Sequence, residues 1–415
     1  MNIFYITLVA LFSNQLFYLI PRHCLPNLFF IVDIGLAIVL CCLFWVFIRY
    51  SSLSIIKNKI SLMILIYLLF VVIQIALAGI HYHQSLINGF IAARHQGYYL
   101  TFFVFLFLFK NPFEITKTLN VLCILSLVAI LLSLINYFGP NILHSSSGEL
   151  MRSGIKRVVM PGKTIIVFSA LWAFCRLQED LKNKFAMMTF IILLCGIFFA
   201  QGRACIVAIS IVILIYLILR KKIGQLFIML FIMIIVIAVL NQHMKENIII
   251  NAYKSTFETV FGEHEAWEGR AEQITTDINE IKKHPWIGSG NVTLRLIPGI
   301  QSRGEQRKIA GIARKTDLGY LHWVKAYGLF GIIWLVYLFY LLFFTGLRLI
   351  KKVTGIRKTI VVFSLSYLAY VMISFVTLNH FMQYYRIPFI CLISALLVRI
   401  EYNNKQQLSQ EESSL

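Results

Sequence analysis

Residues 60–80 read ISLMILIYLLFVVIQIALAGI, an apolar run without a charged side chain. A helix of about 20 such residues is long enough to cross the hydrocarbon core of a bilayer. Only 13% of the 415 residues are charged, and the mean hydropathy is +0.79. Soluble domains carry roughly 25% charged residues. The run therefore predicts a transmembrane helix, and the composition predicts an integral membrane protein.

Comparable apolar runs recur along most of the chain. They fall at residues 3–20, 28–48, 60–80, 86–109, 119–138, 162–178, 185–201, 204–219, 223–241, 322–346, 359–379 and 383–400. The predicted fold class is an all-α polytopic membrane protein with about twelve transmembrane helices and one large extracytoplasmic loop containing helices. Its predicted parts are an N-terminal transmembrane bundle (1–241), the loop (242–317), C-terminal transmembrane helices (318–402) and a disordered cytoplasmic tail (403–415).

Basic residues concentrate in every second connection between these runs. They are Arg49, Lys57, Lys59, Lys110, Lys117, Arg176, Lys182, Lys184, Arg220, Lys221, Lys222, Arg348, Lys351, Lys352, Arg357 and Lys358. Short cytoplasmic loops carry such an excess of Lys and Arg. With an even number of helices, both termini are predicted to be cytoplasmic, and the large loop faces outward. This bias explains much of the net charge of +20, so the charge does not indicate nucleic-acid binding.

Three arginines interrupt apolar surroundings on the predicted outer side. Arg94 breaks the run at 86–109, Arg203 lies at a tight turn, and Arg386 precedes the last run. Charges at membrane depth are costly and mark functional or paired positions. The alternative for Arg386 is that its side chain extends to lipid headgroups. Asp33, the lone acid of the second run, is expected to pair with an interior polar group.

Outward-facing connections carry further positive charge. Arg157 belongs to a basic cluster before residue 163, and Arg314 belongs to the arginine-rich second half of the large loop. Arginine is suited to bidentate capture of phosphate and pyrophosphate. These arginines are accompanied by no carboxylate cluster or Cys/His set with metal-ligand spacing. We therefore expect a phosphorylated substrate, with no metal and no cofactor.

The large loop contains a predicted amphipathic helix. Gly269 and Arg270 precede residues 271–281, where isoleucines recur at helical spacing, and the stretch ends at Pro285-Trp286. A solvated, partly disordered insertion is the alternative. The isoleucines and Trp286 argue against that alternative because they require an apolar surface to pack on.

The order of these motifs resembles the O-antigen ligase and polymerase superfamily of bacterial cell-envelope glycosyltransferases. The residues that carry the resemblance are Gln201-Gly202-Arg203, Gly269-Arg270, His284-Pro285-Trp286-Ile287-Gly288-Ser289-Gly290, Asp317-Leu318-Gly319-Tyr320 and Tyr327-Gly328-Leu329-Phe330-Gly331. The resemblance covers about 201–331, and the helix frame extends it more weakly over the chain.

The resemblance implies a multi-pass protein of the bacterial inner membrane that uses an undecaprenyl-pyrophosphate-linked glycan and an acceptor glycan. The lipid bilayer and other polysaccharide-export proteins are further expected partners, and no metal is implied. By position, Arg203 and Arg270 resemble the arginines that hold the pyrophosphate. Asp317 stands where ligases of this family carry a catalytic histidine. Asp317 could act as general base, or it could instead cap the following helix.

This departure favours a polymerase over a ligase that transfers the glycan to lipid A core. Catalytic roles are predicted for Asp317, Arg203 and Arg270. A second set of residues is predicted to bind pyrophosphate or glycan: Arg94, Arg157, Arg314, Arg386, Trp286 and Tyr320. Open alternatives are a core ligase, a protein O-glycosyltransferase, a lipid-linked glycan transporter or flippase, and a structural subunit.

Overall fold

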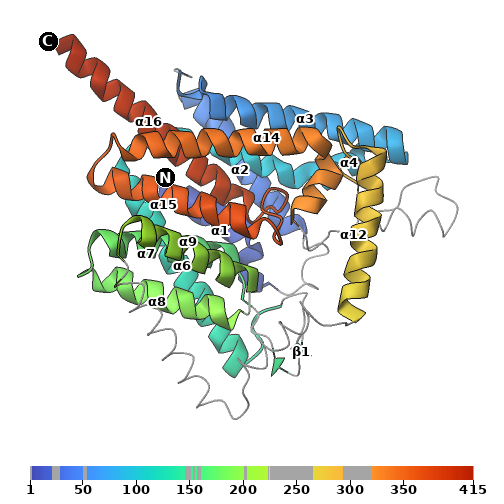
Figure 1. Cartoon of the computed structure of the whole chain (residues 1–415), viewed down its shortest axis with the longest axis horizontal. Coiled ribbons are helices and arrows are strands. Elements are labelled where there is room, and N and C mark those ends of the chain that lie inside the picture. Colours follow the sequence, from blue (N-terminus) through green and yellow to red (C-terminus); the bar gives the residue numbers. More distant parts are fainter. Residues whose placement is uncertain are drawn as a thin grey trace.

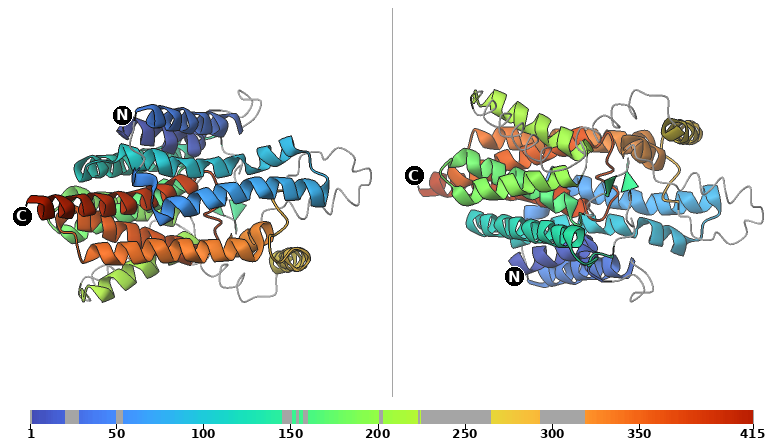
Figure 2. Two further views of the ribbon diagram at one scale, coloured as in Figure 1. Left: turned by 90° about the horizontal axis from the view of Figure 1, so that it is seen from above. Right: turned by 90° about the horizontal axis from the view of Figure 1, so that it is seen from below.

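The computed structural model describes residues 2–20, 29–49, 54–144, 151–152, 155–156, 160–200, 203–222, 224, 265–292 and 319–414. Within these ranges the chain is helical apart from two short antiparallel strands, β1 (Met151–Arg152) and β2 (Ile155–Lys156). The long helices lie side by side in a bundle (Figures 1 and 2). The predicted helical fold class is confirmed in this coarse form.

The helices follow one another with short connections. The α-helices are α1 (Asn2–Ser13), α2 (Phe29–Arg49), α3 (Lys59–Tyr82), α4 (Leu86–Ala93), α5 (Thr101–Leu108), α6 (Pro112–Phe138), α7 (Lys163–Glu179), α8 (Lys184–Phe199), α9 (Arg203–Leu219), α12 (Glu265–Lys283), α14 (Gly319–Ile350), α15 (Gly355–Ser374) and α16 (Ile387–Ser414). Short 3-10 helices are η1 (Gln15–Tyr18), η3 (Ser54–Ile56) and η4 (Arg94–Leu100).

Within the described ranges, 6 helices are long and apolar enough to cross a membrane. They are Ile31–Arg49, Lys59–Tyr82, Pro112–Phe138, Gly319–Ile350, Gly355–Ser374 and Ile387–Gln407. Shorter apolar helices occur in α1, α8 and α9. The structure thus supports a multi-pass membrane protein. The larger predicted number of spans stays a prediction, and the run at 223–241 lies outside the described residues except for residue 224.

Local signals in the sequence account for several helix starts. α3 begins after Asn58, whose side-chain oxygen accepts a hydrogen bond from Ser61 N at 2.8 Å. α6 begins at Pro112, after Asn111, whose side chain accepts from Phe113 N at 3.0 Å. Asparagine caps the free N–H groups of a first turn, and proline at the first helical position loses no helical hydrogen bond.

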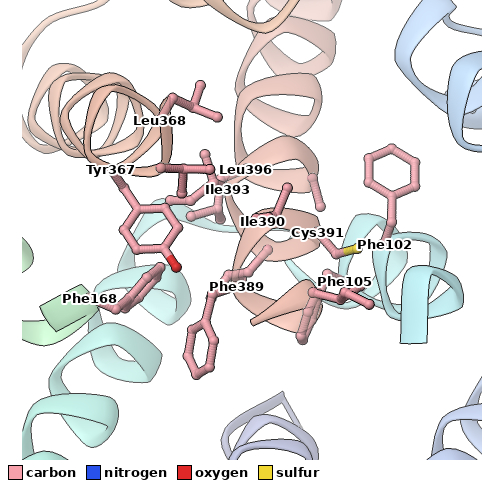
Figure 3. Close-up of a cluster of buried hydrophobic side chains, with 14 of the residues drawn as sticks. Phe102, Phe105, Phe168, Tyr367, Leu368, Phe389, Ile390, Cys391, Ile393 and Leu396 are labelled. Atoms are coloured by element: carbon pink, nitrogen blue, oxygen red, sulfur yellow. The ribbon is translucent and has the colours of Figure 1, made fainter. Parts of the chain in front are cut away.

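The core is apolar and is built around α16. This helix packs against α5, α14 and α15, and Figure 3 shows its side chains meeting Phe102 and Phe105 of α5, Phe168 of α7 and Tyr367 of α15. Large apolar side chains are also exposed on outward faces. On α14 they include Ile333, Val336, Tyr337, Tyr340, Phe344 and Leu347. Such a continuous exposed stripe is suited to contact with lipid.

The run at 86–109, predicted as one interrupted helix, is divided into α4, η4 and α5. At the break, Arg94 Nε lies 2.9 Å from Asp33 Oδ1 of α2. Tyr98 OH donates to the backbone oxygen of Val32 at 2.8 Å. These two contacts fix η4 against α2, and the pair confirms the polar partner expected for Asp33.

The end of α16 differs from the sequence-based prediction. The helix continues to Ser414, where a disordered tail was predicted at 403–415. Lys405 Nζ lies 3.1 Å from Glu401 Oε1, and Asn403 donates to the backbone oxygen of Lys110 at 3.1 Å. Polar composition predicts disorder because it lacks apolar residues to bury, but here the polar groups find partners within the helix and on a distant connection.

α12 lies across the bundle. It runs roughly at right angles to α3 and α14 in Figure 1 and is seen end-on in both views of Figure 2. We call this end of the bundle the α12 end. The chain after α12 binds the backbone of α14: Leu329 N donates to Pro285 O at 2.9 Å, and Phe330 N donates to Trp286 O at 3.1 Å.

Gly328 makes this contact possible. Its φ of 60° and ψ of −156° kink α14, in a region that is essentially restricted to glycine. A Cβ at Gly328 would lie 2.6 Å from Gly288 N and 2.6 Å from the Trp286 carbonyl carbon. Both the backbone conformation and the lack of space therefore require glycine.

We expect Gly328→Ala to lower the free energy of unfolding by about 3 kcal/mol or more, since backbone strain and steric overlap combine. Thermal unfolding of the purified protein in detergent measures this. Gly355→Ala is the matched control, because Gly355 has a φ of 55° but nothing within 4 Å of an added Cβ. Strain alone should cost about 1–2 kcal/mol there. Equal losses for the two variants would contradict the close packing at Gly328.

Candidate active site at the α12 end

A buried ion pair joins α12 to α14. Lys325 Nζ lies 2.7 Å from Asp277 Oδ1, and their side chains are 2% and 0% exposed. Burial raises the pKa of Asp277, an effect that the hydrogen bond and charge of Lys325 only partly offset. Charges removed from water require a partner, and the loss of one partner leaves the other uncompensated. The pair therefore holds α12, and with it the backbone of Arg270, against α14.

The chain that follows α12 is fixed by hydrogen bonds to two helices. Ser289 donates to the backbone oxygen of Lys325 from both N (2.8 Å) and Oγ (3.0 Å). From α3, Gln74 donates to Ile287 O at 2.6 Å. The carbonyl and the side chain of Lys325 thus bind two parts of the same segment, which makes the α12 end a rigid support.

Arg386 lies in the connection 375–386 between α15 and α16 and is 9% exposed. Its guanidinium carbon is 5.2 Å from the centroid of the Tyr385 ring. Among the described residues, its Nη1 is buried without a hydrogen-bond partner, and no carboxylate forms an ion pair with it. The burial excludes extension of this side chain to lipid headgroups, one of the two roles considered from the sequence.

His380 lies in the same connection and is 1% exposed. Its Nε2 is 2.6 Å from Ser374 Oγ, which itself donates to the backbone oxygen of Tyr370 at 2.6 Å. Because the Ser374 proton is used in that bond, Nε2 carries the proton given to Ser374, and Nδ1 keeps a lone pair. Burial lowers the pKa of His380 well below its ordinary value, and the charge of Arg386 lowers it further. The ring is therefore neutral.

More polar atoms without described partners gather around Arg386 and His380. They are Tyr367 OH, Asn379 Oδ1, His380 Nδ1, Gln383 Oε1 and Arg386 Nη1. In Figure 3 the hydroxyl of Tyr367 lies among apolar side chains. Buried polar groups are normally hydrogen-bonded. A group of unsatisfied ones beside a buried cation is therefore a candidate binding site for a polar ligand.

The break in the fourth apolar run reaches this connection. The His95 ring, next to Arg94, lies 4.7 Å from the Tyr384 ring. Tyr384 also accepts a hydrogen bond from the Gln15 side chain. Two of the arginines predicted from sequence, Arg94 and Arg386, are thus brought to the same side of the bundle through Tyr384.

Two more predicted positions lie next to described parts of this region. Tyr370 OH is 3.4 Å from Cys205 Sγ, two residues after Arg203, the first residue of α9. A Cβ at Gly319 would lie 2.4 Å from Phe375 O and 2.6 Å from Leu378 O. Asp317 precedes Gly319 by two residues, so the chain enters α14 against the connection 375–386.

The remaining predicted residues have different standings. Arg203 and Arg270 belong to helices, but their side chains are outside the described residues, as are Arg157, Arg314 and Asp317 altogether. Trp286 and Tyr320 are 70% and 45% exposed, and their predicted contact with glycan stays a prediction. Over the described ranges, His, Cys, Asp and Glu side chains form no group of three or more that could hold a metal ion.

Sequence reasoning missed Asp277, Lys325, Tyr367 and His380. Lys325 could have been noticed as a charged residue inside the apolar run at 322–346. His380 follows Asn379 at the end of another apolar run, which is a weaker signal. Neither Asp277 nor Tyr367 carries a local signal, because their partners lie on other helices.

Comparison with known families covers the centre of the chain. Residues 188–336 match a family model described as O-antigen ligase. This part of the chain is O-antigen ligase-like. The match confirms the resemblance to the O-antigen ligase/polymerase superfamily, and it includes α9, α12 and the kink of α14. No curated protein matches the chain.

The family indicates an O-antigen ligase/polymerase-type function. A membrane protein of this family acts on lipid-linked glycans in a bilayer, as a glycosyltransferase-like enzyme. The apolar helices agree with that setting.

We expect Lys325→Met to lower the free energy of unfolding by about 3–5 kcal/mol, because Asp277 is left charged and buried. The loss should shrink at low pH. Without Lys325 the folded-state pKa of Asp277 lies further above its unfolded value, so stability falls as pH rises through the folded-state pKa. Thermal unfolding over a pH series measures both effects.

The double variant Asp277→Asn/Lys325→Met should recover most of that loss, since it leaves no unpaired charge. Lys283→Met is the control on the same helix: Lys283 Nζ lies 2.9 Å from Glu280 Oε2, but its side chain is 52% exposed. That change should cost less than about 1 kcal/mol. A double variant no more stable than Lys325→Met would contradict the role of the pair.

Proposed function

We propose that this protein is an extracytoplasmic glycosyltransferase that polymerises undecaprenyl-pyrophosphate-linked repeat units of a surface polysaccharide such as O-antigen, capsule or exopolysaccharide. The observation that carries the proposal is the match of residues 188–336 to the O-antigen ligase family. The departure at Asp317, where ligases carry histidine, favours the polymerase. The buried, unpaired Arg386 adds a cation suited to an anionic substrate.

The proposed reaction is displacement at the anomeric carbon of the donor sugar. The bond from this carbon to the pyrophosphate oxygen breaks, and its electron pair leaves with the pyrophosphate. The oxygen of an acceptor hydroxyl forms the new glycosidic bond. Negative charge grows on the leaving group, so cations already placed near it lower the barrier. We assign this role to Arg203, Arg270 and Arg386.

The proton of the acceptor hydroxyl goes to a base, and we propose Asp317 for this role. A carboxylate can accept that proton when it lies within hydrogen-bond reach. The backbone at Gly319 approaches Phe375 O and Leu378 O, which supports a location of Asp317 on the side of Arg386. Arg94, Arg157 and Arg314 are proposed helpers in pyrophosphate binding, and Trp286 and Tyr320 are proposed glycan contacts.

The proposal requires the α12 end to face outward from the bacterial inner membrane, with both termini in the cytoplasm. The distribution of basic residues supports this orientation. Lys351 and Lys352 follow α14, and Lys110 follows α5, both at connections far along the helices from α12. Positive charges of this kind mark the cytoplasmic side.

A ligase is the second candidate, because the matching family model is described as O-antigen ligase. The two activities differ in acceptor: the growing glycan for a polymerase, and lipid A core for a ligase. A glycan gel of a deletion strain distinguishes them. A polymerase is expected to leave a single repeat unit attached, without a ladder. Loss of all attached glycan indicates a ligase, and an unchanged ladder rejects both.

Arg270→Ala in the deletion strain is expected to reduce polymer by about 10²–10³-fold, since a cation facing the developing charge is lost. The amount of protein in the membrane should not change, and immunoblotting of membranes checks this. Arg357→Ala is the control: Arg357 lies near the start of α15, away from α12, and donates to exposed Gln407 at 2.8 Å. Full polymer with Arg270→Ala would reject the assignment.

A further inference from the structure

Arg386 and its neighbours present an unbalanced charge. The guanidinium is nine-tenths buried, and no described carboxylate pairs with it. Tyr367 OH, fully buried at 0% exposure, has no hydrogen-bond partner among the described residues. A buried cation without a counter-charge is costly. Together with a free hydroxyl donor, it fits an anion that reaches the site from outside the protein.

His380 supplies a group whose charge can change when that anion arrives. Its Nδ1 is buried without a described partner, while Ser374 fixes the other ring nitrogen at 2.6 Å. In the ligand-free protein the ring is neutral because it is buried and faces the positive charge of Arg386. A bound anion would reverse the local potential, and a protonated Nδ1 could then donate a hydrogen bond to it.

We propose that Tyr367, His380 and Arg386 form a diphosphate-binding site in which His380 takes up a proton when the diphosphate binds. This inference rests on the proposed function, since the diphosphate would be that of the lipid-linked donor. The proton comes from solvent and is released again when the diphosphate leaves. No covalent bond changes in this step.

The other groups around His380 do not replace it as the titrating group. From α15, Tyr370 meets the His380 ring at 5.7 Å between centroids, and its hydroxyl contacts Cys205 of α9. Within the connection, Asn379 and Gln383 are uncharged, and Tyr385 stacks on Arg386. Among the described residues that act electrostatically on His380, the charge is that of Arg386. Arg203 begins α9 beside Cys205 and would add positive charge.

The direction of the pH dependence follows from this arrangement. The anion raises the pKa of His380 in the complex above its value in the free protein. The extra affinity is therefore present at low pH and is lost as pH rises through the pKa of the complex. Between the two pKa values, affinity should fall up to about tenfold for each pH unit.

Binding of inorganic diphosphate and of farnesyl diphosphate to the purified protein, measured by calorimetry from pH 5 to 8, tests the proposal. In the wild type we expect affinity to weaken with rising pH more steeply than in His380→Gln, which cannot be protonated. Titration of the probe itself is common to both proteins and cancels in the comparison. Tighter binding of farnesyl diphosphate than of inorganic diphosphate indicates a lipid-linked anion, and equal binding indicates a free one.

Arg386→Gln should weaken binding at least tenfold at every pH, and Tyr367→Phe should weaken it several-fold without changing the slope. Arg357→Gln is the control for loss of an arginine elsewhere. Thermal unfolding of each variant shows that it is folded. Equal slopes for the wild type and His380→Gln, wild-type affinity in Arg386→Gln, or no binding by the wild type would each overturn the inference.

The glycan gel of the deletion strain separates this inference from the proposed function. A lost ladder together with pH-independent diphosphate binding rejects the proton coupling alone. A normal ladder rejects the polymerase, whatever the binding experiment gives.

Discussion

The ion pair between Asp277 and Lys325 is the constraint on which the α12 end depends. Because both charges are withdrawn from water, neither can be released without stranding the other. α12 must therefore stay across the bundle, and the segment that follows it must lie on the backbone of α14. Gly288 and Gly328 then leave room for main chain to meet main chain. Arg270 is carried on a helix whose position is fixed by a contact seven residues away.

Two buried cations at this end have opposite surroundings. Lys325 has a carboxylate at 2.7 Å, whereas Arg386 has no such partner among the described residues. Balanced burial gives a rigid scaffold, and unbalanced burial gives a site that gains free energy when an anion enters. Perturbed groups in a protein concentrate at functional sites for this reason. The contrast supports a structural role for Lys325 and a binding role for Arg386.

Much of the helical frame follows from the sequence, since apolar runs of bilayer length have few other stable arrangements. The importance of Arg386 was also predictable, because a charge beside an apolar run is conspicuous. Contacts between distant segments were not predictable. Asp277 looks like any polar residue of an amphipathic helix until Lys325 is placed beside it. His380 gains its role from Ser374 and Arg386, and the tail of α16 is ordered by a carbonyl group near α6.

The position of α16 has a consequence for biosynthesis. This helix follows every other described helix in the chain, yet it packs against α5, α14 and α15 in the centre of the bundle. Arg386 immediately precedes it, so the polar group with Tyr367 and His380 can form only after α16 has been translated and inserted. A nascent chain halted before this point would carry the family-matched region without a complete anion site. Incomplete chains would therefore be unable to sequester the scarce lipid carrier.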